Sequence, residues 1–310
     1  MTLAQDRAPQ RILFFTAILI VLGAGWGITQ PLAKIAVRTG YQPFGLIFWQ
    51  LAVSTIVLGA VNLLRGKGMP MGRGPLRVYL MIALIGTLLP NSASYQAVVY
   101  LQSGLMSVLL SLVPMMAFPV ALFLGLDRLS FLRLLGLLLG LAGVLLIVVP
   151  DASLPDRSVV GWVFVALIAP LCYAWEGNLV ARFGLAGLDP IQALFGASLL
   201  GTLIAVPLVL LTGQWVNPAA EWGAPDIAII ASALIHAIVY TTYVWLVSRA
   251  GPTFAVQVSY LVTGFGVVWA MLLLGEGYSP FLWASLVLMF AGMALVQPRP
   301  GAGELHDPAP

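Results

Sequence analysis

Long apolar runs separated by short polar connections dominate this sequence of 310 residues. A helix needs roughly 20 apolar residues to cross a hydrocarbon layer about 30 Å thick, and most of the runs meet that length. Because backbone groups within lipid must pair internally, such runs form helices. We therefore predict an all-α integral membrane protein with ten transmembrane helices, at residues 12–34, 43–64, 76–98, 103–125, 132–150, 159–181, 190–211, 226–248, 253–274 and 281–297.

The second half of the chain repeats the pattern of the first. A displacement of 149 positions aligns Trp26 with Trp175, and it aligns the acidic-x-x-Ser motifs that begin at Asp127 and Glu276. Each half holds five of the apolar runs, and an odd number of crossings forces the second copy to be inverted. Inverted repeats place a substrate site where the two copies meet. We predict two five-helix inverted repeats and a disordered tail, at residues 1–150, 156–297 and 298–310.

The composition supports a membrane location. The chain is 61% hydrophobic and 8% charged, whereas about 25% of the residues in a soluble domain are charged. The net charge of +3 comes from residues in the short connections, so it indicates membrane topology, and we expect no nucleic-acid partner. Cys172 is the one cysteine, which excludes a disulfide framework and a thiolate metal cluster. We expect neither a metal nor a cofactor.

The basic residues predict the orientation, because cytoplasmic loops carry an excess of Lys and Arg. Both termini are expected in the cytoplasm, with Lys34, Arg38 and Arg157 outside. The first run resembles a signal peptide, but it is too long and lacks a cleavage site, so we expect it to remain. The basic residues on the cytoplasmic side are then Arg7, Arg11, Arg65, Lys67, Arg73, Arg77, Arg128, Arg133, Arg182, Arg249 and Arg299.

Polar and aromatic side chains recur at helical spacing in six of the runs, and polar groups within a bilayer commonly mark a transport pathway. We predict that runs one, three, four, six, eight and nine surround a central cavity, and that the other four pack outside them. Alternatively, these side chains only hydrogen-bond to neighbouring helices. The predicted cavity-lining, substrate-binding residues are Trp26, Gln30, Asn91, Tyr95, Gln102, Ser107, Trp175, Asn178, His236, Tyr240, Tyr243, Gln257 and Tyr260.

Two residues of the runs are candidates for moving protons. Glu176 is the one carboxylate well within a run, where insertion costs about 2.5–3.5 kcal/mol. It is predicted to couple transport to protons or to pair with a substrate ammonium, with a helix-packing acid as the alternative. His236 titrates near neutral pH, with a neutral, hydrogen-bonded imidazole as the alternative. The aromatic side chains suit a substrate with a flat apolar part and a charged end.

Small residues, capping residues and prolines predict the helix packing. The glycine pair that begins at Gly136 allows another helix to approach closely. Ser130 and Ser279 are predicted N-caps of the fifth and tenth helices, and Asp127 and Glu276 are assigned to structure. Interruptions of the helical hydrogen bonding are predicted at prolines within the runs, namely Pro31, Pro90, Pro114, Pro119, Pro170 and Pro207.

The chain contains Trp26-Gly27 followed by Lys34 and Pro43, the stretch 169–182, and acidic-x-x-Ser motifs leading to Gly143 and Gly292. In these motifs it resembles the EamA-type drug/metabolite transporters over residues 11–297. The resemblance implies a carrier with two five-span inverted repeats in the bacterial inner membrane, and the aromatic amino acid exporters are the branch it most resembles. Many members carry an arginine in the second span, where this chain has Gln50, so no role is carried over there.

We therefore predict a secondary transporter, an exporter or facilitator, of small amphipathic metabolites, with aromatic or large apolar amino acids as substrates. Alternating access around a midplane site is the expected mechanism, and no enzymatic activity is expected. The expected partners are the substrate and the lipid bilayer, with the chain as a monomer or homodimer. The alternatives are an exporter of other metabolites or drugs, an intramembrane lipid enzyme using His236 and Glu176, and a channel, which the lack of charged rings disfavours.

Overall fold

The computed structural model describes residues 7–154 and 156–296, so the predicted tail at 298–310 lies outside the described residues. The described residues form helices and no strands. Eight helical segments are long and apolar enough to cross a membrane. The predicted ninth and tenth spans correspond to two shorter apolar helices, Val258–Leu274 and Pro280–Val296. The chain is thus an all-helical, multi-pass membrane protein.

The first half contains the first five predicted spans, three of which are divided into consecutive helices. These elements are α1 (Arg7–Gly27), α2 (Thr29–Val37), α3 (Pro43–Leu64), α4 (Arg73–Met81), the π-helix η1 (Ile82–Leu88), α5 (Leu89–Tyr100), α6 (Ser103–Leu110), α7 (Val113–Phe123) and α8 (Phe131–Val148).

The second half has a similar succession of elements. They are the 3₁₀ turn η2 (Arg157–Val159), α9 (Val160–Ala166), α10 (Ile168–Phe183), α11 (Pro190–Thr212), α12 (Ala224–Ala250), α13 (Pro252–Ala255), α14 (Val258–Leu274) and α15 (Pro280–Val296).

Prolines account for where the spans are divided. A proline cannot donate to the carbonyl four residues earlier, and its ring clashes with that carbonyl. Pro31, Pro114 and Pro170 each stand four residues after the last residue of α1, α6 and α9. Pro90 likewise removes the donor for Gly86, and here the chain forms the π-helix η1. Prolines are also tolerated within the continuous helices α7 and α11.

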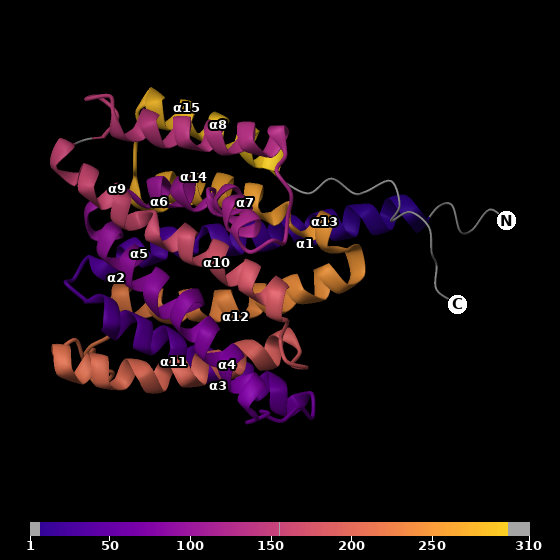
Figure 1. The fold of residues 1–310 in the computed structure, drawn as a ribbon. Coiled ribbons are helices and arrows are strands. Elements are labelled where there is room, and N and C mark those ends of the chain that lie inside the picture. Colours follow the sequence, from indigo (N-terminus) through magenta and orange to yellow (C-terminus); the bar gives the residue numbers. More distant parts are fainter. Residues whose placement is uncertain (1–6, 155, 297–310) are drawn as a thin grey trace.

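Helices of the two halves pack against one another throughout the bundle. Figure 1 shows α8 beside α15 at one edge and α3 beside α11 at the other. Between these pairs, α1 packs on α12 and α14, α2 on α12, α6 on α14, and α10 on α5 and α7. We call the end of the bundle where α1 begins and α3 ends the N-terminal face. The distal face is the end where α3 begins and α5 ends.

Glycines permit the closest of these contacts. A Cβ on Gly136 of α8 would lie 2.6 Å from the carbonyl oxygen of Gly292 on α15, and the reciprocal distance is also 2.6 Å. The α8 and α15 backbones therefore touch, as the glycine pair predicts. Ser130 and Ser279 directly precede α8 and α15, at the predicted N-cap positions, but their hydroxyls bind differently from the prediction. Ser130 makes no side-chain capping bond, and the hydroxyl of Ser279 donates to the carbonyl of Ser153 at 2.9 Å, so it fastens two loops together.

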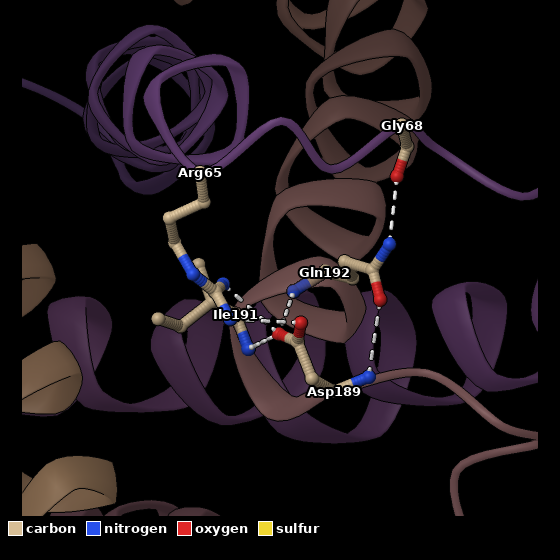
Figure 2. A network of polar contacts seen from close by, with 5 residues as sticks. All are labelled: Arg65, Gly68, Asp189, Ile191 and Gln192. Atoms are coloured by element: carbon tan, nitrogen blue, oxygen red, sulfur yellow. Dashed lines mark hydrogen bonds and ion pairs between the residues drawn. The ribbon is translucent and has the colours of Figure 1, made fainter.

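Both ends of the α3–α11 pair are fastened by polar contacts. At the N-terminal face, Arg65 forms an ion pair with Asp189 at 3.0 Å, and Asp189 also caps α11 by accepting from the amides of Ile191 and Gln192 (Figure 2). Figure 2 also shows the Gln192 side chain donating to the Gly68 carbonyl at 2.8 Å. The two segments that meet here therefore share one polar network.

At the distal face, Gln214 fastens the other end of the pair, and it follows Arg65 by 149 residues. Its side-chain oxygen accepts from the amide of Phe44, in the first turn of α3, at 2.9 Å. The α3–α11 pair is therefore fastened by charged side chains at one face and by a neutral amide at the other.

Asp189→Ala should destabilise the protein in a pH-dependent manner. Partial burial by itself would raise the pKa of Asp189, but the hydrogen bonds from Arg65 and the two amides hold the pKa below its ordinary value. A lowered pKa stabilises the fold above the unfolded value of about 3.9 and ceases to do so as the pH falls through the folded value. We expect a loss of about 1 kcal/mol at pH 7, which shrinks below about pH 4.

Thermal unfolding in detergent across a pH series measures this effect. Asp151→Ala is the matched control, because the Asp151 side chain is 96% exposed and pairs with Arg157 at 3.5 Å. Equal unfolding temperatures for the two variants at pH 7 would contradict the assignment.

Candidate functional site

A cavity of about 190 Å³ lies in the interior of the bundle, where the broken helices meet. Residues of both halves line it, from α2, α3, η1, α5 and α6 of the first and α10, α11 and α12 of the second. None of the described lining residues is Asp, Glu, Lys or Arg. Its polar lining is Thr29, Gln30, Gln50, Ser54, Thr87, Asn91, Ser94, Tyr95, Tyr173, Ser198, Ser232 and His236.

A hydrogen-bonded network of four of these side chains organises one wall. The Gln50 carbonyl oxygen accepts from the Tyr95 hydroxyl at 3.0 Å and from the Asn91 amide at 3.3 Å. The Asn91 oxygen in turn accepts from the Tyr173 hydroxyl at 3.2 Å. Because Tyr173 belongs to α10 and the others to α3 and α5, the network joins the two halves. It fixes neutral polar groups at the cavity surface, where they can exchange these bonds for bonds to a substrate.

An aromatic cluster supports His236 on α12. The Trp26 indole donates to His236 Nδ1 at 3.3 Å, so a neutral imidazole in this arrangement carries its proton on Nε2. The Tyr240 ring stacks on His236 at 6.3 Å, and the Tyr243 ring lies 5.4 Å from that of Trp26. Trp26 is on α1, so the cluster joins span one to span eight and holds the imidazole in place.

Glu176 of α10 lies beside the π-helix η1. A Cβ built on Gly86 would lie 2.6 Å from the Glu176 carboxylate carbon, so the carboxylate sits directly on the Gly86 backbone. Gly86 and Thr87 line the cavity from the same segment. The salt bridges among the described residues do not include Glu176. A half-buried carboxylate without an ionic partner therefore adjoins the cavity wall.

The structure distributes the predicted site residues over three places. Four line the cavity, namely Gln30, Asn91, Tyr95 and His236. Three more, Trp26, Tyr240 and Tyr243, form the cluster around His236. The remaining six lie outside both groups, and they are Gln102, Ser107, Trp175, Asn178, Gln257 and Tyr260.

Three of these six join segments by hydrogen bonds or close packing. Gln102 donates to the Gly277 carbonyl at 3.0 Å, and Asn178 donates to the carbonyls of Ala117 and Ala174. Ser107 is buried where α6 meets α14, with its hydroxyl 2.2 Å from the position of a Cβ on Gly266.

The other three are peripheral or pack on neighbouring rings. Trp175 packs against Phe123 with 6.0 Å between ring centres. Tyr260 packs against Phe290 at 5.7 Å, and Gln257 is exposed. In this arrangement none of the three is part of the cavity wall.

The prediction that spans two and seven pack outside the cavity is wrong. Gln50 and Ser54 of α3 and Ser198 of α11 line it, whereas α14 of span nine contributes no lining residue. The signal for α3 was the four-residue spacing of Gln50 and Ser54, which places both on one helix face. Spans five and ten, α8 and α15, lie away from the cavity, as expected.

Groups of three or more His, Cys, Asp or Glu able to hold a metal ion do not occur among the described residues. The candidate site is thus a neutral polar cavity with an adjacent aromatic cluster and an adjacent carboxylate.

A family model for the EamA-like transporter family matches this chain twice, at residues 13–149 and 160–297. The chain belongs to the EamA-like transporter family. It is a membrane transporter for small molecules and not an enzyme, so the lipid-enzyme alternative is set aside. The two matches also correspond closely to the two halves seen in the sequence.

Individual relatives agree with this assignment. The chain is 24% identical over 300 residues to "Uncharacterized transporter YvbV" of Bacillus subtilis (strain 168), covering 93% of this chain and 92% of that one. It is 25% identical to "WAT1-related protein At3g02690, chloroplastic" of Arabidopsis thaliana, covering 87% of this chain and 65% of that one. A solved structure described as "Crystal structure of protein" has a similar fold, with a TM-score of 0.61 and 20% identity over 89% of this chain and 94% of that one.

Gln50→Leu should destabilise the protein more than Gln30→Leu. The first substitution leaves the Tyr95 hydroxyl and the Asn91 amide without their shared acceptor, and an unpaired buried donor costs about 1–3 kcal/mol. Gln30 lines the same cavity outside this network, so its replacement is the matched control. Thermal unfolding followed by tryptophan fluorescence measures both, and equal unfolding temperatures would show that the network contributes nothing.

Proposed function

We propose that this protein is a secondary carrier for small amphipathic metabolites, specifically aromatic or large apolar amino acids, working by alternating access. The observation that carries the proposal is the neutral polar cavity formed by both halves beside an aromatic cluster. Amide, hydroxyl and imidazole groups are suited to the ammonium and carboxylate of an amino acid, and the rings of the cluster are suited to its side chain. A cavity of about 190 Å³ limits the cargo to small molecules.

The helix contacts support two inverted five-helix repeats of ten spans. If each span is exchanged for its counterpart five spans later, the contact of α1 with α14 becomes that of α10 with α7. The contact of α2 with α12 likewise becomes that of α10 with α5. The pairs α8–α15 and α3–α11 map onto themselves. A pseudo-twofold relation of this kind is what rocking of one repeat against the other requires.

The basic residues support an N-terminal face in the cytoplasm of a bacterial cell, because the positive-inside rule applies to short loops. The described connections at that face carry Arg65, Lys67 and Arg73, among others, against Lys34, Arg38 and Arg157 at the distal face. This orientation places both termini in the cytoplasm. Export then corresponds to transport from the N-terminal face to the distal face.

Purified protein in liposomes should move labelled tryptophan and phenylalanine faster than protein-free vesicles do, with saturation and counterflow. Asn91→Ala should lower kcat/KM about tenfold, because a hydrogen bond to a charged group is worth about 1.5 kcal/mol or more. Gln257→Ala, an exposed position, is the matched control. Absence of flux for a panel of amino acids and amphipathic amines would refute the proposed substrate class, and unsaturable flux without counterflow would indicate a channel.

Glu176 is proposed to couple this transport to protons. Its position on the Gly86 backbone places a titratable group against the segment that carries Thr87 and Asn91 into the cavity. Loss or gain of a proton there changes whether the carboxylate repels or hydrogen-bonds to the backbone of η1. The titratable neighbours of Glu176 are Cys172 and Tyr173 on α10, with Tyr95 next to Tyr173, and Tyr240 on α12.

Glu176→Gln should therefore retain substrate exchange but lose accumulation driven by a pH gradient. Gly86→Ala should have a similar effect, because its methyl would displace the carboxylate. Gly177→Ala is the matched control on α10, since a Cβ there meets nothing within 4 Å. Flux into proteoliposomes with and without an imposed pH gradient makes the measurement. An unchanged response to the gradient in Glu176→Gln would exclude the coupling role and leave the carrier proposal intact.

A further inference from the structure

A carboxylate from the second half caps a helix of the first half at the distal face. Glu276, between α14 and α15, accepts from the amide and hydroxyl of Ser103 at 2.8 and 3.0 Å and from the amide of Gly104 at 3.1 Å. The Tyr278 hydroxyl donates to the same carboxylate at 2.6 Å. These bonds hold the first turn of α6 to the loop before α15. Hydrogen bonds to an ionised acceptor are roughly twice as strong as neutral ones.

A lysine makes a second connection at the same face. The Lys34 ammonium, near the end of α2, donates to the carbonyls of Val98, Val99 and Leu101 at 2.7, 3.0 and 3.0 Å. Val98 and Val99 belong to the last turn of α5, where intrahelical donors are absent, and Leu101 directly follows the helix. Lys34 also lies within electrostatic range of Glu276. Spans one, three, four and nine are thus tied together on one side of the cavity.

At the N-terminal face, the described residues that align with or next to Glu276 and Lys34 have other partners. Asp127 aligns with Glu276 in the repeat, but it pairs with Arg133 of the adjoining helix α8. Arg182, one position from the residue aligned with Lys34, donates to the Leu124 carbonyl at the end of α7. Among the described helices, α10 and α12 do not form an interface comparable to that of α2 with α5, their counterparts at the distal face.

We propose that Glu276 and Lys34 form a latch that holds the distal face closed, so that the cavity is reached from the N-terminal face in this conformation. The inference rests on the proposed function, because it concerns the side from which the proposed site is reached. The two residues are positioning residues, since neither lines the cavity. Release of Ser103 and Gly104 from Glu276 separates α6 from the α14–α15 loop, and release of α5 from Lys34 frees the neighbouring wall.

Thiol accessibility tests the latch directly. Ser94, a cavity residue of α5, becomes a reporter as Ser94→Cys in a Cys172→Ser background. A membrane-impermeant methanethiosulfonate is added to either side of oriented vesicles. In the latched protein the reporter should react from the N-terminal face, and Glu276→Gln should raise the rate from the distal face about tenfold. Asp127→Asn is the matched control, because the aligned acid lies at the opposite face.

A purely structural cap would lower the unfolding temperature without changing the side of labelling, and that result would overturn the latch. Glu276→Asp should keep part of the wild-type preference for labelling from the N-terminal face, because the substitution keeps the charge. Lys34→Gln should act in the same direction as Glu276→Gln. An unaltered labelling pattern in a carrier that still exchanges substrate would refute the latch alone. A reporter that reacts from neither face, in a protein without flux, would refute the proposed function as well.

The converse experiment locks the face. Gln102→Cys and Gly277→Cys place two thiols across a contact that the wild-type side chain bridges at 3.0 Å. In a Cys172→Ser background, a short, reducible bifunctional thiol reagent should then stop net transport, and reduction of the bridge should restore it. Transport that continues at the original rate with the bridge formed would show that this face need not open, and would overturn the proposal.

Discussion

The structure depends on the requirement that every backbone polar group in hydrocarbon finds a partner. Prolines deprive this chain of helical donors near the middle of four spans, at Pro31, Pro90, Pro114 and Pro170. Irregular backbone at that depth is tolerated where it is enclosed by protein or lines a cavity. Side chains take up some of the carbonyls around the breaks, as when the Thr29 hydroxyl donates to Trp26 at 2.6 Å. The prolines that break these four spans therefore also account for the irregular backbone beside the cavity.

The chemistry of the cavity follows from the cost of charge in the same medium. A charge at mid-bilayer costs about 2.5–3.5 kcal/mol to insert, and the described lining of the cavity consists of neutral groups. Amides and hydroxyls can satisfy one another when no ligand is bound, as Gln50, Asn91 and Tyr173 do. They can then redirect their bonds to a zwitterion. The nearby carboxylate of Glu176 sits against backbone, and the salt bridges among the described residues do not include it.

Much of the fold, but less of the site, could be predicted from the sequence. Apolar runs and their breaks at prolines are local properties, so the helices appear where the pattern places them. The cavity depends on which face of each helix meets which neighbour. Gln50 and Ser54 share one face of the otherwise apolar α3, and this pair is a weaker signal than the longer polar series in other spans. Ser107 belongs to such a series, but Gly266 lets α14 cover it. A serine that lines a cavity and a serine that packs against a neighbouring helix give the same pattern along their own helix.

The strength of a latch in such a carrier has an upper bound. A substrate shifts a conformational equilibrium only by the difference between its affinities for the two states. A neutral site gains that difference from a few hydrogen bonds to the charged groups of the substrate, each worth about 1.5–3 kcal/mol. The free energy needed to break a deeply buried ion pair would exceed what substrate binding at such a site can supply. Glu276, in contrast, lies in a loop and is only partly buried, so water can replace its partners. The position of the carboxylate at the rim of the bundle is therefore consistent with a contact that forms and breaks in each cycle.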